Sequence, residues 1–281
     1  MSDLQMSSRP GFTGRLNTRI LARVRTLSRD LQLPDLEQKF SHLLLGTGSW
    51  RAPPPGDNVN LAAYIDHTLL KPDATEAEVL QLCKEARQYG FYAVCVNGSR
   101  VRLCVDALRK SGVRTAVCCG FPLGSGCSAA KAAEARRGVE DGALDVDMVI
   151  NVGAVKDKNY LLVYKDIKSV VDACGPRVTT KVILETCLLD ENEIIDCCIL
   201  AVAAGASYVK TSTGFNRGGA TPEVVDVMLA VVGNAAKVKA SGGVRDRAVA
   251  LQFVQAGVSR IGTSSGVAIV SNPLTRSTSK Y

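Results

Sequence analysis

Three lysines stand out because each lies in or beside a short apolar segment typical of a buried strand. They are Lys181 in T-T-K-V-I-L-E, Lys210 in S-Y-V-K-T-S-T-G and Lys239 in K-V-K-A-S-G-G-V-R. Lysine is seldom buried without a partner. Two ammonium groups held close repel each other, and one of them can lose its proton near neutral pH. An uncharged lysine amine forms a Schiff base with a carbonyl substrate, so the pattern indicates covalent carbonyl chemistry without a metal.

A carboxylate in an apolar setting adds to this pattern. Asp147 lies in the segment D-V-D-M-V-I-N, and strand alternation places it on the same face as Val149 and Asn151. A carboxylate that points into the barrel needs a cationic or hydrogen-bonding partner, and a lysine cluster would supply one. For one aspartate alone, a buried ion pair without a catalytic role is the simpler interpretation. Three lysines on neighbouring strands favour catalysis.

The elements that must position these residues repeat from residue 61 onward as a short apolar strand, a turn and an amphipathic helix. We expect strands near 62–66, 92–96, 115–119, 146–151, 181–184, 208–210, 236–239 and 260–261. Strands that alternate with helices predict an all-parallel sheet. Eight such units over residues 61–270 predict an α/β fold, a single (β/α)₈ TIM barrel, whose strands would carry their polar residues to one mouth. An open doubly wound sheet is the alternative, although the first strand-to-helix turn, H-T-L-L-K-P, lacks its glycine fingerprint.

Helix starts can also be read from the sequence. Thr75 with Glu78 and Asp190 with Glu193 have the spacing of a capping box before apolar residues. Both pairs therefore predict helices that begin one residue after Thr75 and Asp190.

Residues 1–60 differ from the predicted barrel. The first 29 residues contain six arginines and one acidic residue, and apolar side chains recur there at helical spacing. An organelle transit peptide is one interpretation, since such peptides are rich in arginine and serine and poor in acids. A helix that lies on the barrel, or a disordered extension, is the other. We assign 1–60 to an N-terminal extension that ends in a proline-rich linker, and 271–281 to a C-terminal tail.

Composition narrows the class of protein. The chain has 281 residues, is 46% hydrophobic and carries a formal net charge of +7, with only 5% aromatic residues. Dispersed basic residues with few aromatics argue against nucleic-acid binding and favour an anionic small-molecule ligand. No segment approaches the ~20 apolar residues of a membrane span. Ten cysteines without C-x-x-C spacing indicate a reducing compartment such as the cytoplasm, and two isolated histidines disfavour a zinc site.

Two glycine and serine turns follow the last two predicted strands. Gly242 and Gly243 come after the seventh strand, and Ser264 and Ser265 come after the eighth. In TIM barrels the phosphate site is commonly built from these two loops. A single turn of this kind is weak evidence, but the pair at these positions predicts a phosphate-binding site.

Several of these segments together resemble deoxyribose-phosphate aldolases, a family of class I aldolases. The similar segments are S-Y-V-K-T-S-T-G, D-H-T-L-L-K, C-C-G-F-P-L-G, V-D-M-V-I-N and K-A-S-G-G-V-R, and they extend over about residues 61–270. The resemblance implies reversible cleavage of 2-deoxy-D-ribose 5-phosphate to D-glyceraldehyde 3-phosphate and acetaldehyde. It also implies that no cofactor is needed and that the protein forms a dimer or a tetramer.

The resemblance implies roles for individual residues. Lys210 is similar to the family's Schiff-base lysine, and Lys239 to the second lysine, whose charge favours an uncharged amine at Lys210. Asp147 matches the carboxylate that works with Lys239, through a water, to move protons. Lys181 and Cys95 match residues that support or line the site. Asp66 would lie at the end of the first strand, and Gly242, Gly243, Ser264 and Ser265 match the phosphate-binding turns.

Two positions depart from the family or stay open. Phe215 stands where the family often has a lysine after T-S-T-G, and Tyr281 could reach the site from the tail or belong to a disordered end. Another Schiff-base barrel aldolase that acts on a different phosphorylated aldehyde is an alternative function. A non-catalytic sugar-phosphate-binding barrel is a second.

Overall fold

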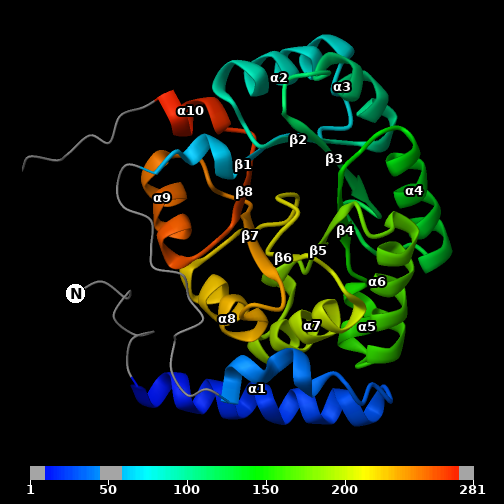
Figure 1. The fold of residues 1–281 in the computed structure, drawn as a ribbon, viewed down its shortest axis with the longest axis vertical. Coiled ribbons are helices and arrows are strands. Elements are labelled where there is room, and N and C mark those ends of the chain that lie inside the picture. The colour runs from blue at the N-terminus through cyan, green and yellow to red at the C-terminus, as the bar shows by residue number, and fades with distance from the viewer. Residues whose placement is uncertain (1–9, 45–58, 272–281) are drawn as a thin grey trace, which may run out of the picture.

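Eight parallel strands close into a barrel in the computed structural model, which describes residues 10–44 and 59–271 (Figure 1). Their order around the barrel is their order in the chain. The strands are β1 Ile65–Leu69, β2 Ala93–Val96, β3 Arg114–Cys119, β4 Asp145–Val149, β5 Thr179–Ile183, β6 Tyr208–Lys210, β7 Lys237–Ser241 and β8 Arg260–Thr263. The predicted (β/α)₈ barrel is therefore confirmed.

Helices surround the strands and cover the outer face of the barrel (Figure 1). The α-helices are α1 Pro10–Asp30, α2 Glu76–Tyr89, α3 Val101–Ala107, α4 Ser128–Glu140, α5 Val152–Lys156, α6 Tyr160–Cys174, α7 Glu191–Ala204, α8 Pro222–Val232, α9 Arg247–Ala256 and α10 Gly266–Ser271. Short 3₁₀ turns are η2 Glu37–Leu44, η3 Leu61–Tyr64, η4 Gly98–Arg100 and η5 Thr186–Leu188. The two predicted capping boxes are present, at Thr75 with Glu78 and at Asp190 with Glu193.

Alternation along β4 separates the core from the barrel interior. Val146, Met148 and Ile150 are fully buried in the hydrophobic cluster between strands and helices. Asp145 and Asp147 alternate with them and are equally buried, so they face inward. Burial of β4 on both faces is expected for a parallel strand covered by helices. The interior side is where polar side chains meet.

The first strand begins later than predicted. Residues 62–66 were expected as a strand, but Leu61–Tyr64 form a 3₁₀ turn. The side chain of Asn60 caps the N-terminal end of this turn. Asn60 Oδ1 accepts a hydrogen bond from the Ala62 N–H at 3.2 Å. An asparagine cap stabilises a helical turn, and this local hydrogen bond outweighs the apolar pattern of L-A-A-Y-I. As a result, Asp66 is the second residue of β1 and not its last.

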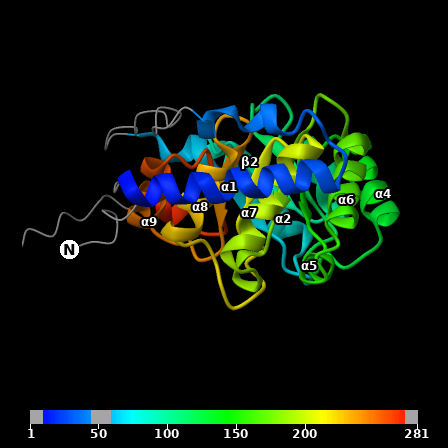
Figure 2. The same cartoon turned by 90° about the horizontal axis from the view of Figure 1, so that it is seen from below.

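The N-terminal extension contains a long helix that packs on the barrel. Figures 1 and 2 show α1 crossing the outer surface of α7 and α8, two helices that lie far from α1 in the sequence. Its apolar stripe is buried, with Leu16, Ile20, Val24 and Leu27 at 8% exposure or less. The helical alternative for the extension is thus confirmed in residues 10–30. The proline-rich linker falls outside the described residues, and a role in targeting stays a prediction.

Ion pairs set the position of α1 along α7. Arg23 makes a two-pronged contact with the buried Asp196, with Nε–Oδ1 at 2.7 Å and Nη2–Oδ2 at 2.8 Å. Arg19 of α1 pairs with Glu191, the first residue of α7. Bidentate arginine–carboxylate pairs have a narrow geometry, so they select one register where an apolar stripe alone would allow several.

We expect Val24→Asp to lower the free energy of unfolding by about 3 kcal/mol, because it puts an unpaired charge into a fully buried position. Urea titration of the full chain measures the effect. Ala22→Asp is the control, since Ala22 is exposed on the same helix and should change stability by less than about 0.5 kcal/mol. Equal effects of the two substitutions would contradict a docked α1.

Every helix within residues 10–44 and 59–271 is too short or too polar to span a bilayer.

Candidate active site

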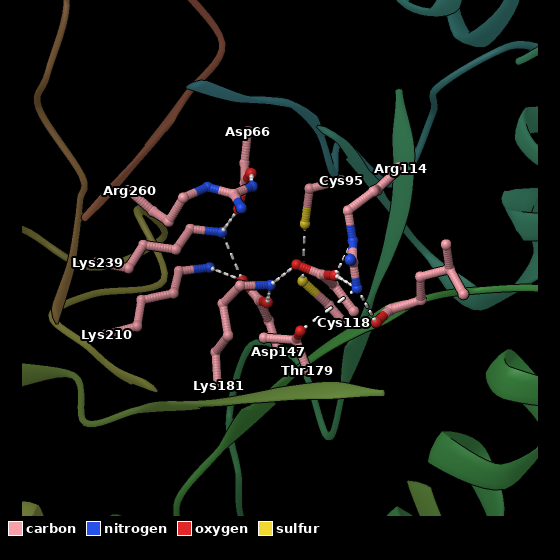
Figure 3. A network of polar contacts seen from close by, with 12 residues as sticks. Asp66, Cys95, Arg114, Cys118, Asp147, Thr179, Lys181, Lys210, Lys239 and Arg260 are labelled. Atoms are coloured by element: carbon pink, nitrogen blue, oxygen red, sulfur yellow. Dashed lines mark hydrogen bonds and ion pairs between the residues drawn. The ribbon is translucent and has the colours of Figure 1, made fainter. Parts of the chain in front are cut away.

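A single carboxylate gathers three lysines inside the barrel. Asp147 Oδ2 lies 2.9 Å from Lys210 Nζ and 2.7 Å from Lys239 Nζ, and Asp147 Oδ1 lies 2.9 Å from Lys181 Nζ (Figure 3). All four side chains are buried, with Lys210 at 3% exposure and the others at 0%. The lysines that the sequence places on separate strands therefore meet at one point.

Strand register explains why these residues meet. Asp147 of β4 pairs with Lys181 of β5, and Lys210 of β6 pairs with Lys239 of β7. Residues paired in a parallel sheet lie side by side, and inward-facing positions of a small barrel form shared layers. Lys210 ends its strand, whereas Lys181 and Lys239 are each at the centre of theirs.

The charges of the cluster depend on one another. Burial alone would raise the pKa of Asp147, but the ammonium groups of Lys181, Lys210 and Lys239 outweigh it and hold this pKa well below its usual value. Burial would likewise lower the pKa of Lys239, yet the attraction of Asp147 outweighs it and raises the pKa. Asp147 is therefore anionic and Lys239 cationic at neutral pH.

Two further aspartates extend the cluster at its edges. Lys239 Nζ also lies 2.5 Å from Asp66 Oδ2, and Lys181 Nζ lies 2.5 Å from Asp145 Oδ2. Asp66 was expected at the end of a strand, but it reaches Lys239 from near the start of β1. Each of these two lysines thus bridges a pair of carboxylates, while Lys210 contacts one carboxylate among the described residues, that of Asp147.

Sequence reasoning missed three members of the cluster: Asp145, Arg114 and Arg260. Arg114 Nε lies 2.7 Å from Asp145 Oδ1, and Arg260 pairs with Asp66. The Arg260 guanidinium carbon also lies 3.2 Å from the ring centroid of Tyr92. The sequence could have indicated Asp145, because it lies on the same strand face as Asp147. Both arginines are the first residues of their strands, and only the closed barrel shows that their side chains point inward.

Taken together, the cluster has more cations than anions. Five cationic side chains meet three carboxylates; they are Lys181, Lys210, Lys239, Arg114 and Arg260 against Asp66, Asp145 and Asp147. Buried charge of one sign is unfavourable unless it is neutralised. The excess positive charge favours an anionic ligand.

Cys95 lies in the wall of the barrel beside these residues (Figure 3). It is fully buried, and its Sγ lies 3.7 Å from Cys118 Sγ on the next strand. This contact with Cys118 lowers the pKa of Cys95 to about 7, against the effect of burial. Leu70, Ala116 and both cysteines form a small apolar cluster that is separate from the main core. Cys95 therefore lies on the side of the barrel opposite the lysines of β5 to β7, and its part in lining the site stays a prediction.

The two glycine and serine turns lie next to each other. Thr263 Oγ1, at the end of β8, donates to Val244 O at 2.7 Å, and so joins the turn that contains Ser264 and Ser265 to the one that contains Gly242 and Gly243. Gly242 and Gly243 have φ of +83° and +79°, a conformation that favours glycine. Gly243 and Ser264 are exposed, so the paired turns are open to solvent.

An aromatic pair lies over the loops that follow β3 and β6. Phe215 is 51% exposed and meets Phe121 edge to face, with ring centroids 5.1 Å apart. It offers no charge to a phosphate where the family often has a lysine. Tyr281 falls outside the described residues.

Within residues 10–44 and 59–271, no group of three or more histidine, cysteine or acidic side chains is arranged to hold a metal ion. The polar cluster consists instead of ammonium, guanidinium and carboxylate groups.

Known proteins share this sequence and this fold. The family described as "DeoC/LacD family aldolase" matches residues 60–272. A deoxyribose-phosphate aldolase of Geobacillus sp. (strain WCH70) is 54% identical over 211 residues, which are 75% of this chain and 95% of that protein.

Two solved structures are similar as well. One, provisionally assigned as a deoxyribose-phosphate aldolase from Coccidioides immitis, is 39% identical with a TM-score of 0.78, over 87% of this chain and 96% of that one. The other, described as a unique tetrameric structure of deoxyribose phosphate aldolase from Aeropyrum pernix, is 32% identical with a TM-score of 0.71, over 85% and 97%. The extent of these matches shows that the chain belongs to the DeoC/LacD family of aldolases.

Proposed function

We propose that this chain is a deoxyribose-phosphate aldolase, which reversibly cleaves 2-deoxy-D-ribose 5-phosphate to D-glyceraldehyde 3-phosphate and acetaldehyde. The observation that carries the proposal is the contact of Lys210 and Lys239 with the same oxygen, Asp147 Oδ2, inside a closed barrel. The relative from Geobacillus, named for this activity, supports the choice of substrate.

Lys210 is the proposed nucleophile. Its uncharged amine attacks C1 of the open-chain sugar, and loss of water from the carbinolamine gives a protonated Schiff base. Lys210 has fewer carboxylate contacts than Lys181 and Lys239. Of these three lysines, Lys210 alone is slightly exposed. The neighbouring ammonium of Lys239 disfavours a second charge at this point.

Asp147 and Lys239 are the proposed proton-transfer groups. Cleavage of the C2–C3 bond sends its electron pair into the Schiff base and gives an enamine, while the proton of the C3 hydroxyl leaves. The enamine then takes a proton at C2, and water releases acetaldehyde from Lys210. Lys239 and Asp147 lie 2.7 Å apart beside Lys210, which supports their part in moving these protons.

The remaining predicted residues have supporting roles in this proposal. Asp66 and Lys181 hold Lys239 and Asp147 in place through ion pairs of 2.5 and 2.9 Å, and Cys95 lines the apolar side. Gly242, Gly243, Ser264 and Ser265 bind the phosphate through backbone N–H and hydroxyl groups. The excess positive charge of the cluster also favours a phosphorylated substrate.

We further propose that the protein acts as a homo-oligomer in the cytoplasm. The tetrameric relative from Aeropyrum pernix supports self-association. All ten cysteines are free thiols, which supports a reducing compartment. Targeting to an organelle by residues 1–60 is the alternative.

Release of acetaldehyde from deoxyribose 5-phosphate tests the activity. Coupling to alcohol dehydrogenase should show turnover at a rate of about 1 s⁻¹ or more, as is usual for an enzyme on its own substrate. A panel of other phosphorylated aldehydes run in parallel separates this activity from that of another Schiff-base aldolase. Binding of deoxyribose 5-phosphate without turnover would instead favour the non-catalytic barrel.

A further inference from the structure

Glu185, which comes two residues after the end of β5, is a charged residue in an unfavourable setting. Its backbone is left-handed, with φ 54° and ψ 60°, a region that residues other than glycine, asparagine and aspartate rarely adopt. Its side chain is also buried, since the residue is only 1% exposed. Backbone strain and burial of a carboxylate both oppose this arrangement, so other contacts must hold it.

Apart from a sulfur contact, Cys187 Sγ to Oε1 at 3.8 Å, the hydrogen bonds that the described residues make to the Glu185 carboxylate come from one loop, residues 211–220, which follows Lys210. Oε1 accepts from the Thr213 N–H at 3.3 Å, and Oε2 accepts from the Thr213 hydroxyl and from Asn216 Nδ2, the latter at 3.1 Å. Among the described residues no lysine or arginine forms an ion pair with Glu185. The charge is therefore compensated by neutral donors, three from the loop and the more distant Cys187 thiol.

The opposite edge of the same loop rests on the turn after β7. Ala220 donates its N–H to Gly242 O at 3.1 Å, and Thr211 Oγ1 donates to Ser241 O at 2.9 Å. A Cβ on Gly219 would lie 2.3 Å from Gly242 O, so the two backbones are in close contact. Loop 211–220 is thus held by Glu185 on one side and packs against the proposed phosphate turn on the other.

We infer that Glu185 is a positioning residue that sets the place of loop 211–220 and, through it, of the Gly242–Gly243 turn. It acts through the loop and not on the substrate. Lys210 itself is held separately, because the Leu184 N–H donates to Lys210 O at 2.9 Å and the Thr186 N–H donates to Thr211 O at 3.0 Å. Loss of the carboxylate should therefore weaken phosphate binding and spare Schiff-base formation, which is the part of the inference that rests on the proposed function.

Two substitutions separate the carboxylate from the backbone strain. Glu185→Gly suits the left-handed backbone but removes the side chain, whereas Glu185→Gln keeps the shape and removes the charge. With either, we expect the Kd for inorganic phosphate and the KM for deoxyribose 5-phosphate to rise about tenfold, and kcat to change by less than about threefold. Labelling of Lys210 by acetaldehyde and borohydride should be unchanged. Asp141→Asn, a buried carboxylate at the opposite end of the barrel, is the control and should change none of these.

Hydrogen exchange of the backbone amides decides the inference even without turnover. Amides of residues 211–220 and 242–244 should exchange at least about tenfold faster in both variants than in the unmodified protein. Unchanged exchange would overturn the positioning role, as would a KM for unphosphorylated deoxyribose that rises as much as that for the phosphate ester. Absence of acetaldehyde release by the unmodified protein would refute the proposed function and leave the exchange result to judge Glu185.

Discussion

Replacement of Lys210 by methionine is expected to reduce turnover of deoxyribose 5-phosphate by at least about 10⁴-fold. Methionine has nearly the length of lysine but no amine, so no Schiff base can form. The fold should persist, because Asp147 keeps its contacts with Lys181 and Lys239 and the cluster loses one of its surplus cations. Steady-state acetaldehyde release measures the loss of activity, and circular dichroism checks the fold.

A covalent label makes the Lys210 experiment specific. Acetaldehyde followed by borohydride should add a reduced two-carbon group to the peptide that contains Lys210, and Lys210→Met should remove this label. Lys237→Met is the matched control, since Lys237 is an exposed lysine of β7 and should keep both label and turnover. Residual activity above about 1% in Lys210→Met would mean that another residue is the nucleophile.

The second large effect concerns stability. Asp147→Asn should lower the free energy of unfolding by about 3 to 5 kcal/mol, because the buried lysines that contact Asp147 lose their shared counter-charge. It should also abolish most turnover, since proton transfer would lose its carboxylate. Urea titration measures the first effect. The control is Asp172→Asn, which removes an exposed partner of Lys168 and should cost less than about 0.5 kcal/mol. An equally small cost for Asp147→Asn would mean that Asp147 does not stabilise the buried lysines.

The same carboxylate should govern stability in acid. Its pKa in the folded protein lies well below the ordinary value of 3.8, so its contribution is complete above that value and is lost as the pH falls below it. The unmodified protein should therefore lose stability more steeply below about pH 4 than Asp147→Asn does. Parallel slopes for the two proteins would mean that Asp147 is not held by the lysines.

The barrel was predictable because apolar residues recur about every second residue in strands and about every fourth residue in helices. Seven of the eight strands overlap closely with their expected ranges, since apolar runs between capped helices admit few other arrangements. The first strand was misplaced because a hydrogen bond from Asn60 favours a turn over an apolar run. Local chemistry of this kind is visible in the sequence, but its strength relative to the strand pattern is not.

The site was predictable where a residue type is unusual for its position and unpredictable where it is not. Asp147 and the lysines interrupt apolar strands, so they attract notice. Arg114 and Arg260 begin their strands, where charged residues commonly face solvent, and they turn inward only because the closed barrel brings Asp145 and Asp66 within reach. Such contacts depend on register between strands and not on sequence spacing.

The docking of α1 also has a consequence for how the protein is made. Its partner Asp196 lies 173 residues further along the chain than Arg23. At usual rates of translation the ribosome needs about 10 to 35 s to add that many residues. During this interval α1 can pack against η2, but it lacks its partners on α7 and α8. A receptor or chaperone that recognises a basic amphipathic helix would have access to this face of α1 on the nascent chain, before α7 is synthesised and packs against it.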